Sequence, residues 1–252
     1  MTLPVEPTAD TLSLYTVYMC HHIKPDSVDT YLSGICQQLE PYFANIQEAR
    51  KGQLVHRTLE GCKCLHGTPT FRKRALMIAD LNVVCLTYND TSSHDDLLFY
   101  TQLCVGFFAL MQLGELTFPD NVALRDPRKV TKRSSVCLSQ GFFQFFLPGH
   151  KADRFFEGNT VILRENPLPC NPMAFFQLYI TSRNTRFPLS SPLWLTANSQ
   201  IPTRTFFMRH LHLWFEKGIA GQSMHAGRAT SLAENGVTPH IICREALPYR
   251  TM

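Results

Sequence analysis

The sequence predicts a mainly α protein of the α+β class, organised in two domains. Apolar residues recur at the three-to-four-residue spacing of amphipathic helices through the first 66 residues. Between residues 136 and 163 the pattern instead predicts short strands, and helical patterns lie on both sides of this stretch. Helices, a small antiparallel sheet and further helices form an order typical of α+β domains.

Three helices are expected in the first domain, residues 1–70. The first covers residues 11–22, the second follows the Pro25-Asp26-Ser27 breaker and extends to Leu39, and the third covers residues 52–65. Residues 67–74 are polar, basic and rich in helix breakers, which is typical of a linker. We therefore place the domain boundary at residues 70–76.

The second domain, residues 77–252, is expected to begin its helical core after Thr91-Ser92-Ser93, with one apolar helix from Asp96 to Leu113. The segment VCLSQGFFQFFL, residues 136–147, predicts two strands around Gln140-Gly141. A third strand is expected at 160–163, and further helices at 172–182, 202–214 and 221–237.

Composition excludes several classes of protein. No apolar run approaches the length of a membrane span, and the N-terminus lacks the pattern of a secretory signal. The nine cysteines are odd in number and scattered, which favours buried, reduced thiols in an intracellular protein. Cys62 and Cys64 lie near His56 and His66, but no second paired half completes a zinc motif. We expect neither a metal nor a cofactor.

Positive charge is clustered although the net charge is only +4. Residues 50–74 hold seven Lys or Arg and one acid, and residues 125–133 hold five and one. Such clusters suit a phosphate backbone, while a solvated basic face is the alternative.

Residues 221–237, GQSMHAGRATSLAENGV, form a helical pattern closed by Asn235-Gly236. This segment resembles the helix of tyrosine recombinases and integrases that opens with a His-x-x-Arg box. Residues 97–237 resemble recombinase-like proteins of fungal mobile elements, and residues 11–66 more weakly resemble the helical core-binding domain of that family. The resemblance implies a DNA-gripping helical domain followed by a catalytic-type domain.

In that family a tyrosine attacks a phosphodiester, two arginines bind the phosphate oxygens, and a lysine and a histidine assist proton transfer. The resemblance places Gln112, before Gly114-Glu115-Leu116, at the first arginine position. Gln222 and His225 occupy the two ends of the His-x-x-Arg box, and Lys151 matches the lysine of a β-hairpin. Only Lys151 therefore keeps the catalytic residue type.

After residue 242 the sequence no longer resembles the family. Tyr249 is the only tyrosine after the box, and Pro248 disfavours the helical setting of a nucleophile. The resemblance therefore implies a degenerate, C-terminally truncated recombinase that binds DNA without cutting it.

We expect duplex DNA as the partner, with several copies of the protein assembling on it. We expect no membrane partner, and a nuclear location. Two other hypotheses stay open: a helical protein-interaction module without a nucleic-acid role, and a recombinase completed in trans by another subunit. The expected DNA-binding residues are basic and lie in or near the two clusters or the helices beside them: Arg72, Lys73, Arg74, Arg128, Lys129, Lys132, Arg133, Arg154 and Arg204.

Overall fold

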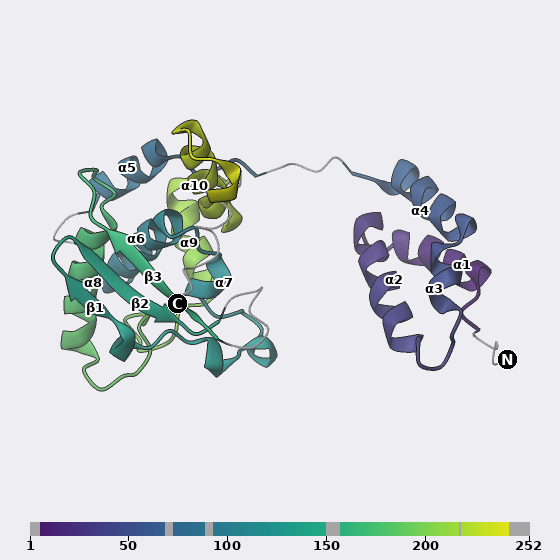
Figure 1. Cartoon of the computed structure of the whole chain (residues 1–252), viewed down its shortest axis with the longest axis horizontal. Helices are drawn as coiled ribbons and strands as arrows, with labels where there is room; N and C mark the ends of the chain where they lie inside the picture. Colours follow the sequence, from purple (N-terminus) through teal and green to yellow (C-terminus); the bar gives the residue numbers. More distant parts are fainter. Residues whose placement is uncertain (1–5, 69–72, 89–92, 150–156, 217, 242–252) are drawn as a thin grey trace. The chain divides into compact units, whose positions relative to one another are not determined.

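The computed structural model describes residues 6–68, 73–88, 93–149, 157–216 and 218–241. The chain divides into two compact units, Met1–Phe71 and Arg72–Met252, and the division falls within the segment expected to link two domains (Figure 1). The architecture is mainly helical, with one three-stranded antiparallel sheet in the second unit. The predicted fold class is confirmed.

The first unit is a small bundle of the helices α1 (Ala9–Cys20), α2 (Pro25–Leu39), α3 (Ile46–Lys51) and α4 (Gln53–His66). Thr8 caps α1, and Pro25 occupies the first turn of α2, where its missing N–H costs nothing. The three predicted helices are present and α3 is additional. The second begins at Pro25, so the residues expected as a breaker form its first turn and Lys24 is its N-cap. The core of the bundle is apolar on the inward stripe of each helix: Leu12, Val28, Leu32, Ile46, Val55 and Leu59.

The second unit is built around α6 (His94–Phe108), which is buried on nearly every side. Ser93 starts this helix because its hydroxyl accepts the backbone N–H of Asp96, whose carboxylate in turn accepts the backbone N–H of Ser93. Before it lies α5 (Ile78–Leu86), which the sequence pattern did not predict. The expected single helix from Asp96 to Leu113 is wrong, because α6 ends at Phe108 and a separate short helix, α7 (Leu113–Leu116), follows.

The sheet has the order β1-β2-β3, with β1 (Cys137–Ser139), β2 (Phe142–Leu147) and β3 (Asn159–Arg164). Gly141 adopts φ 78° in the predicted turn between β1 and β2, a conformation that glycine adopts without strain. Phe143 of β2 stacks on Phe176 with ring centroids 4.0 Å apart, so the inward face of the sheet is fixed to the helical core.

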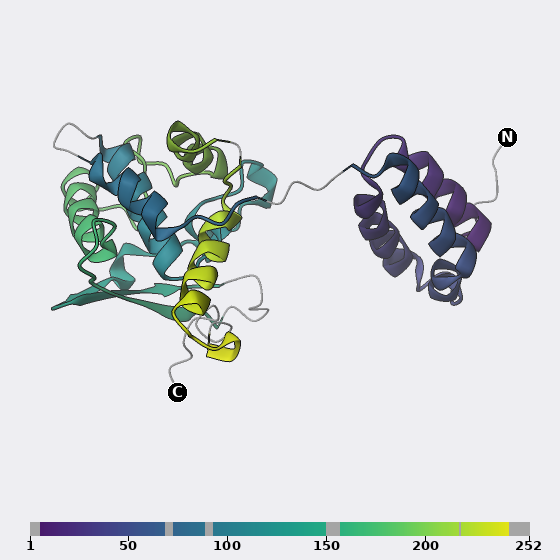
Figure 2. The ribbon, with the colours of Figure 1, turned by 90° about the horizontal axis from the view of Figure 1, so that it is seen from above.

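Three further helices lie in the described part of the second unit: α8 (Pro172–Arg186), α9 (Arg204–Trp214) and α10 (Gln222–Glu234). In Figure 2 the sheet is seen nearly edge-on, with α8 on one side of it and α10 running past its level. Asn171 caps α8 and Thr203 caps α9 through side-chain oxygens that accept backbone N–H groups. Three short 3₁₀ turns lie between α7 and β1, at Val122–Leu124, Pro127–Lys129 and Arg133–Ser135.

Among the described residues, no helix combines the length and apolar character needed to cross a membrane. In the same ranges, no three His, Cys, Asp or Glu side chains gather as metal ligands would. Of the cysteines that the structure describes, Cys64 and Cys137 are exposed and the others are buried, and all eight are free thiols. The expectation of buried thiols therefore does not hold for these two.

Candidate nucleic-acid site

The candidate site begins at the turn that ends α6. The N–H of Leu110 donates to Phe107 O at 3.2 Å, and the N–H of Met111 donates to Gly106 O at 2.9 Å, which together form a Schellman cap. Leu110 adopts φ 54°, the left-handed conformation that glycine usually occupies in this motif. The chain reverses there, and Gln112 starts α7 instead of ending α6.

Glu115 holds Gln112 in place. The backbone N–H of Gln112 donates to a carboxylate oxygen of Glu115 at 2.8 Å, so this carboxylate neutralises one of the donors left unpaired at the start of α7. The Gln112 side chain itself is exposed. The turn therefore presents an uncharged amide to solvent from a fixed backbone.

The N-terminal half of α10 packs directly against this turn. A Cβ built on Gly221 would lie 2.6 Å from Leu113 Cδ2, so only glycine allows so close an approach. His225 Nδ1 lies 2.7 Å from Leu110 O. A carbonyl oxygen only accepts, so Nδ1 carries the hydrogen, and Nε2 is the acceptor nitrogen of the neutral ring.

Gln112, Gln222 and His225 are thereby placed on two neighbouring elements. Gln222 and His225 are three residues apart on α10 and share one side of it. Gln222 is exposed and His225 is half-buried. Their amides and imidazole can hydrogen-bond to phosphate oxygens, but they supply no arginine fork and no permanent positive charge. Their assignment as degenerate catalytic positions stays a prediction.

Three of the expected site residues lie outside the described residues: Lys151, Arg154 and Arg72. Tyr249, which the sequence analysis disfavoured as a nucleophile, also lies outside them. The predicted convergence of Lys151 with Gln112 and His225 is therefore untested.

Several predicted DNA-binding cations of the second unit contact groups of the protein itself. Arg74 donates to both carboxylate oxygens of Asp80, at 2.7 and 3.1 Å. Arg128 donates to both oxygens of Asp126, at 3.0 and 2.9 Å, and these hydrogen bonds lower the pKa of Asp126. These two ion pairs make the effective charge of the basic segments smaller than the sequence count.

Arg133 also has an internal contact, because its Nε donates to Asn184 Oδ1 at 3.0 Å. The remaining described candidates are Lys73, Lys129, Lys132 and Arg204, and all four are exposed. We expect Lys129, Lys132 and Arg204 to be able to meet a phosphate backbone.

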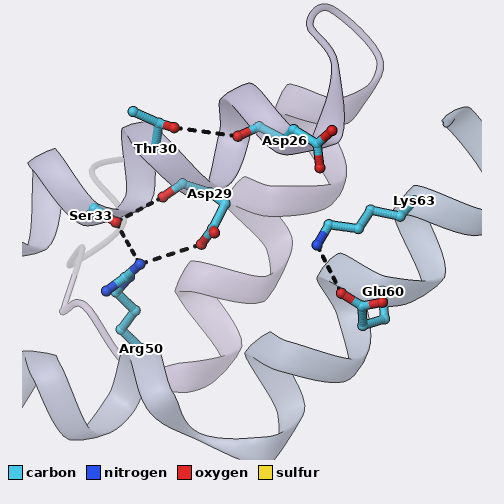
Figure 3. Close-up of polar contacts among 7 residues, drawn as sticks. All are labelled: Asp26, Asp29, Thr30, Ser33, Arg50, Glu60 and Lys63. Carbon is cyan, nitrogen blue, oxygen red and sulfur yellow. Dashed lines mark hydrogen bonds and ion pairs between the residues drawn. The ribbon is translucent and has the colours of Figure 1, made fainter. Parts of the chain in front are cut away.

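In the first unit, the basic segment is also partly neutralised. Figure 3 shows Arg50 donating to Ser33 and to Asp29, the latter at 3.3 Å, and Lys63 donating to Glu60 at 2.9 Å. The hydrogen bond from Lys63 lowers the pKa of Glu60. Arg50 and Lys63 are thus hydrogen-bonded to side chains of the bundle itself.

A cleft of about 680 Å³ lies beside β3, and the sequence prediction missed the two arginines that line it, Arg164 and Arg228. Arg228 follows His225 by one helical turn, and its guanidinium lies 5.4 Å from the Phe108 ring centroid. The sequence signal that could have identified Arg228 is its spacing of three residues from His225, which places both on the same side of a helix.

Comparison with known proteins identifies the fold. No protein-family model and no curated protein sequence matches the chain. A crystal structure of the XerH site-specific recombinase bound to a palindromic difH substrate, a post-cleavage complex, matches with a TM-score of 0.59 and 14% identity, covering 96% of this chain and 65% of that one. A crystal structure of a lambda integrase (75–356) dimer bound to a COC′ core site matches with a TM-score of 0.50 and 10% identity, covering 99% and 85%.

The chain spans 65% of the length of the XerH chain that it matches. At these identities the similarity concerns the fold, which is that of tyrosine recombinases.

Proposed function

We propose that this protein is a DNA-binding, recombinase-derived protein that does not cleave DNA. The observation that carries the proposal is the contact between the α7 turn and α10. His225 contacts Leu110 there, two residues before Gln112. The resemblance implies arginines at the positions of Gln112 and His225, and the chain holds an arginine at neither. Both side chains can bind a phosphate oxygen, whereas neither supplies the fixed charge that stabilises a phosphoryl transition state.

Support for DNA as the partner comes from the fold and from the exposed cations. The two solved recombinases with this fold are DNA complexes. Lys129, Lys132 and Arg204 are exposed in the second unit, and basic side chains supply most of the affinity for a phosphate backbone. A fungal mobile-element origin, a nuclear location and assembly of several copies on DNA are parts of the same proposal.

Cleavage is tested with nicked suicide substrates followed by denaturing electrophoresis. We expect no covalent protein–DNA band, because the loss of several members of one charge-stabilising unit raises the barrier by several kcal/mol. A DNA-linked band that disappears in the Tyr249→Phe variant would overturn the proposal.

Binding is tested by fluorescence anisotropy with duplex DNA over a range of salt concentrations, comparing Gln112→Arg with Gln177→Arg. Both glutamines are exposed, and the control adds the same charge on α8, away from the α7 turn. If Gln112 faces a phosphate, its replacement by arginine steepens the slope of log K against log salt by about 0.9, and the control does not. If the two variants gave equal slopes, the face that carries Gln112 would not contact DNA.

The protein-interaction hypothesis is favoured instead if affinity for DNA is absent even at low salt. The internal ion pairs of Arg74 and Arg128 are the observation in its favour, because a charge already paired contributes less to phosphate binding. Completion of the active site in trans would be detected in the same cleavage assay, by mixing the chain with an active recombinase.

A further inference from the structure

β3 is one of the two outer strands of the sheet. Strand order β1-β2-β3 leaves one side of β3 without a neighbouring strand. The N–H of Glu165 donates to Gly141 O at 2.9 Å, and β2 and β3 continue in the same antiparallel register. Hydrogen-bonded pairs alternate in such a ladder, so Val161 and Leu163 bond to β2.

The alternate residues of β3 therefore direct their backbone groups away from the sheet. These are Thr160, Ile162 and Arg164, each with one N–H and one C=O. None of these six groups has a hydrogen-bond partner within the described ranges. Their spacing repeats every second residue, which is the pattern that an added strand recognises.

The cleft of about 680 Å³ lies along this edge. Its lining runs from Thr160 to Asn166 and includes apolar side chains on the far wall: Ile78, Phe108 and Leu168. Ile162 is 48% exposed and Thr160 is half-buried, so both side chains are accessible to a neighbour on the outer face of the sheet. The edge of β3 thus lines a walled groove.

Charge at the groove is positive. Arg164 and Arg228 line it, with Glu165 as the only carboxylate among the residues that line it. Because an extended chain supplies both donors and acceptors to a strand edge, whereas a nucleic-acid backbone supplies mainly phosphate acceptors, the unpaired groups fit a polypeptide better.

We propose that this groove binds an extended, acidic peptide segment of a partner protein, which adds to β3 as a fourth strand. Backbone groups of Thr160, Ile162 and Arg164 pair with the peptide backbone. Arg164 and Arg228 attract its carboxylates, while the apolar wall receives alternate side chains. This interaction goes beyond the proposed binding of DNA at the α7 turn, although Leu110 of that turn also lines the groove.

Amide hydrogen exchange followed by NMR on the full chain tests the geometry directly. The probe is an acetylated peptide of alternating glutamate and valine, about six residues long, the usual length of a strand. Without peptide, we expect fast exchange at Thr160, Ile162 and Arg164 and slow exchange at Val161 and Leu163. Peptide should slow the first three by at least about tenfold and leave the other two unchanged.

Variants test the backbone and charge contributions separately. Ile162→Pro removes an N–H that does not bond to β2, a position where an edge strand tolerates proline. We expect it to weaken binding of the peptide by at least about tenfold, while Ile162→Val, the matched control, binds as the parent does. Arg164→Glu should weaken binding of the glutamate peptide and strengthen that of the same peptide with lysines.

Three results would overturn the proposal. One is slow exchange at the three edge amides in the free chain, because another part of the chain would then cover the edge. Another is protection of these amides by duplex DNA but not by the peptide. The third is protection that depends on protein concentration in the absence of peptide, because a second copy would then occupy the groove. Failure of Ile162→Pro to fold leaves the exchange pattern of the unsubstituted chain as the deciding measurement.

Discussion

Replacing Gly227 by alanine should destabilise the second unit, although alanine favours helices. Gly227 lies in α10 against the segment that enters the second unit. A Cβ built there would lie 1.7 Å from Leu76 O, no more than half of an ordinary contact distance. The N–H of Leu76 also donates to Ser223 O at 3.0 Å, so the two backbones are in direct contact.

The size of the effect follows from three contributions. Alanine in place of glycine gains about 1 kcal/mol of helix propensity. Separating the backbones to an ordinary contact of at least 3.4 Å requires a shift of 3.4 − 1.7 = 1.7 Å, and overpacking of this kind costs about 1–3 kcal/mol or more. Loss of the Leu76–Ser223 hydrogen bond adds about 1 kcal/mol. The expected net loss is about 2 kcal/mol, or about 4–8 °C in Tm for a unit of this size.

Tryptophan fluorescence during urea unfolding measures this loss selectively, because both tryptophans, Trp194 and Trp214, lie in the second unit. Gly114→Ala is the matched control, since a Cβ at that position of α7 meets nothing within 4 Å. The control should unfold at the same urea concentration or a higher one. Unchanged stability of Gly227→Ala would refute the packing of the entering segment on α10.

Three further outcomes are expected from the same unfolding assay. Arg183 is 1% exposed and donates to three backbone carbonyls, of which Phe187 O also accepts the N–H of Ser190. Arg183→Met therefore leaves Ser190 O and Pro192 O unpaired and should cost about 3 kcal/mol. Burial lowers the pKa of His94 from 6.5, so the unfolded chain binds the proton more readily than the folded chain. The free energy of unfolding should therefore fall as the pH drops below 6.5, and His94→Gln should make this decline shallower. Ser93→Ala removes the cap of α6 and should cost about 1 kcal/mol, visible as an earlier midpoint.

Helical periodicity and turn chemistry predicted most elements because their signals are local. The turn at Gln140-Gly141 is an example, since the glycine that the pattern required adopts φ 78°. The end of α6 had no such signal. The run from Phe107 to Leu113 contains no glycine or proline, and Leu110 adopts a left-handed conformation that no local sequence signal predicts. Tertiary packing of α10 on this turn overrides the local preference.

Charge patterns were less informative because partners of a cation are set by the fold. Counting cations assigned Arg133 to a DNA-binding cluster, yet its Nε contacts Asn184, 51 residues away in the sequence. The family resemblance placed Gln112 and His225 in one site, and the structure brings their elements into contact. No sequence pattern could predict the hydrogen bond from His225 to Leu110 O, because it depends on the reversal of the chain direction at Leu110.

The segment that enters the second unit is tied to the α10 region at two points. The N–H of Arg74 donates to Gly218 O at 2.9 Å, and the N–H of Leu76 donates to Ser223 O. These two hydrogen bonds fix the segment that holds Arg74 and Leu76 to the beginning of the helix that carries Gln222 and His225. A substitution that displaces this segment therefore also shifts the backbone from which these two side chains extend.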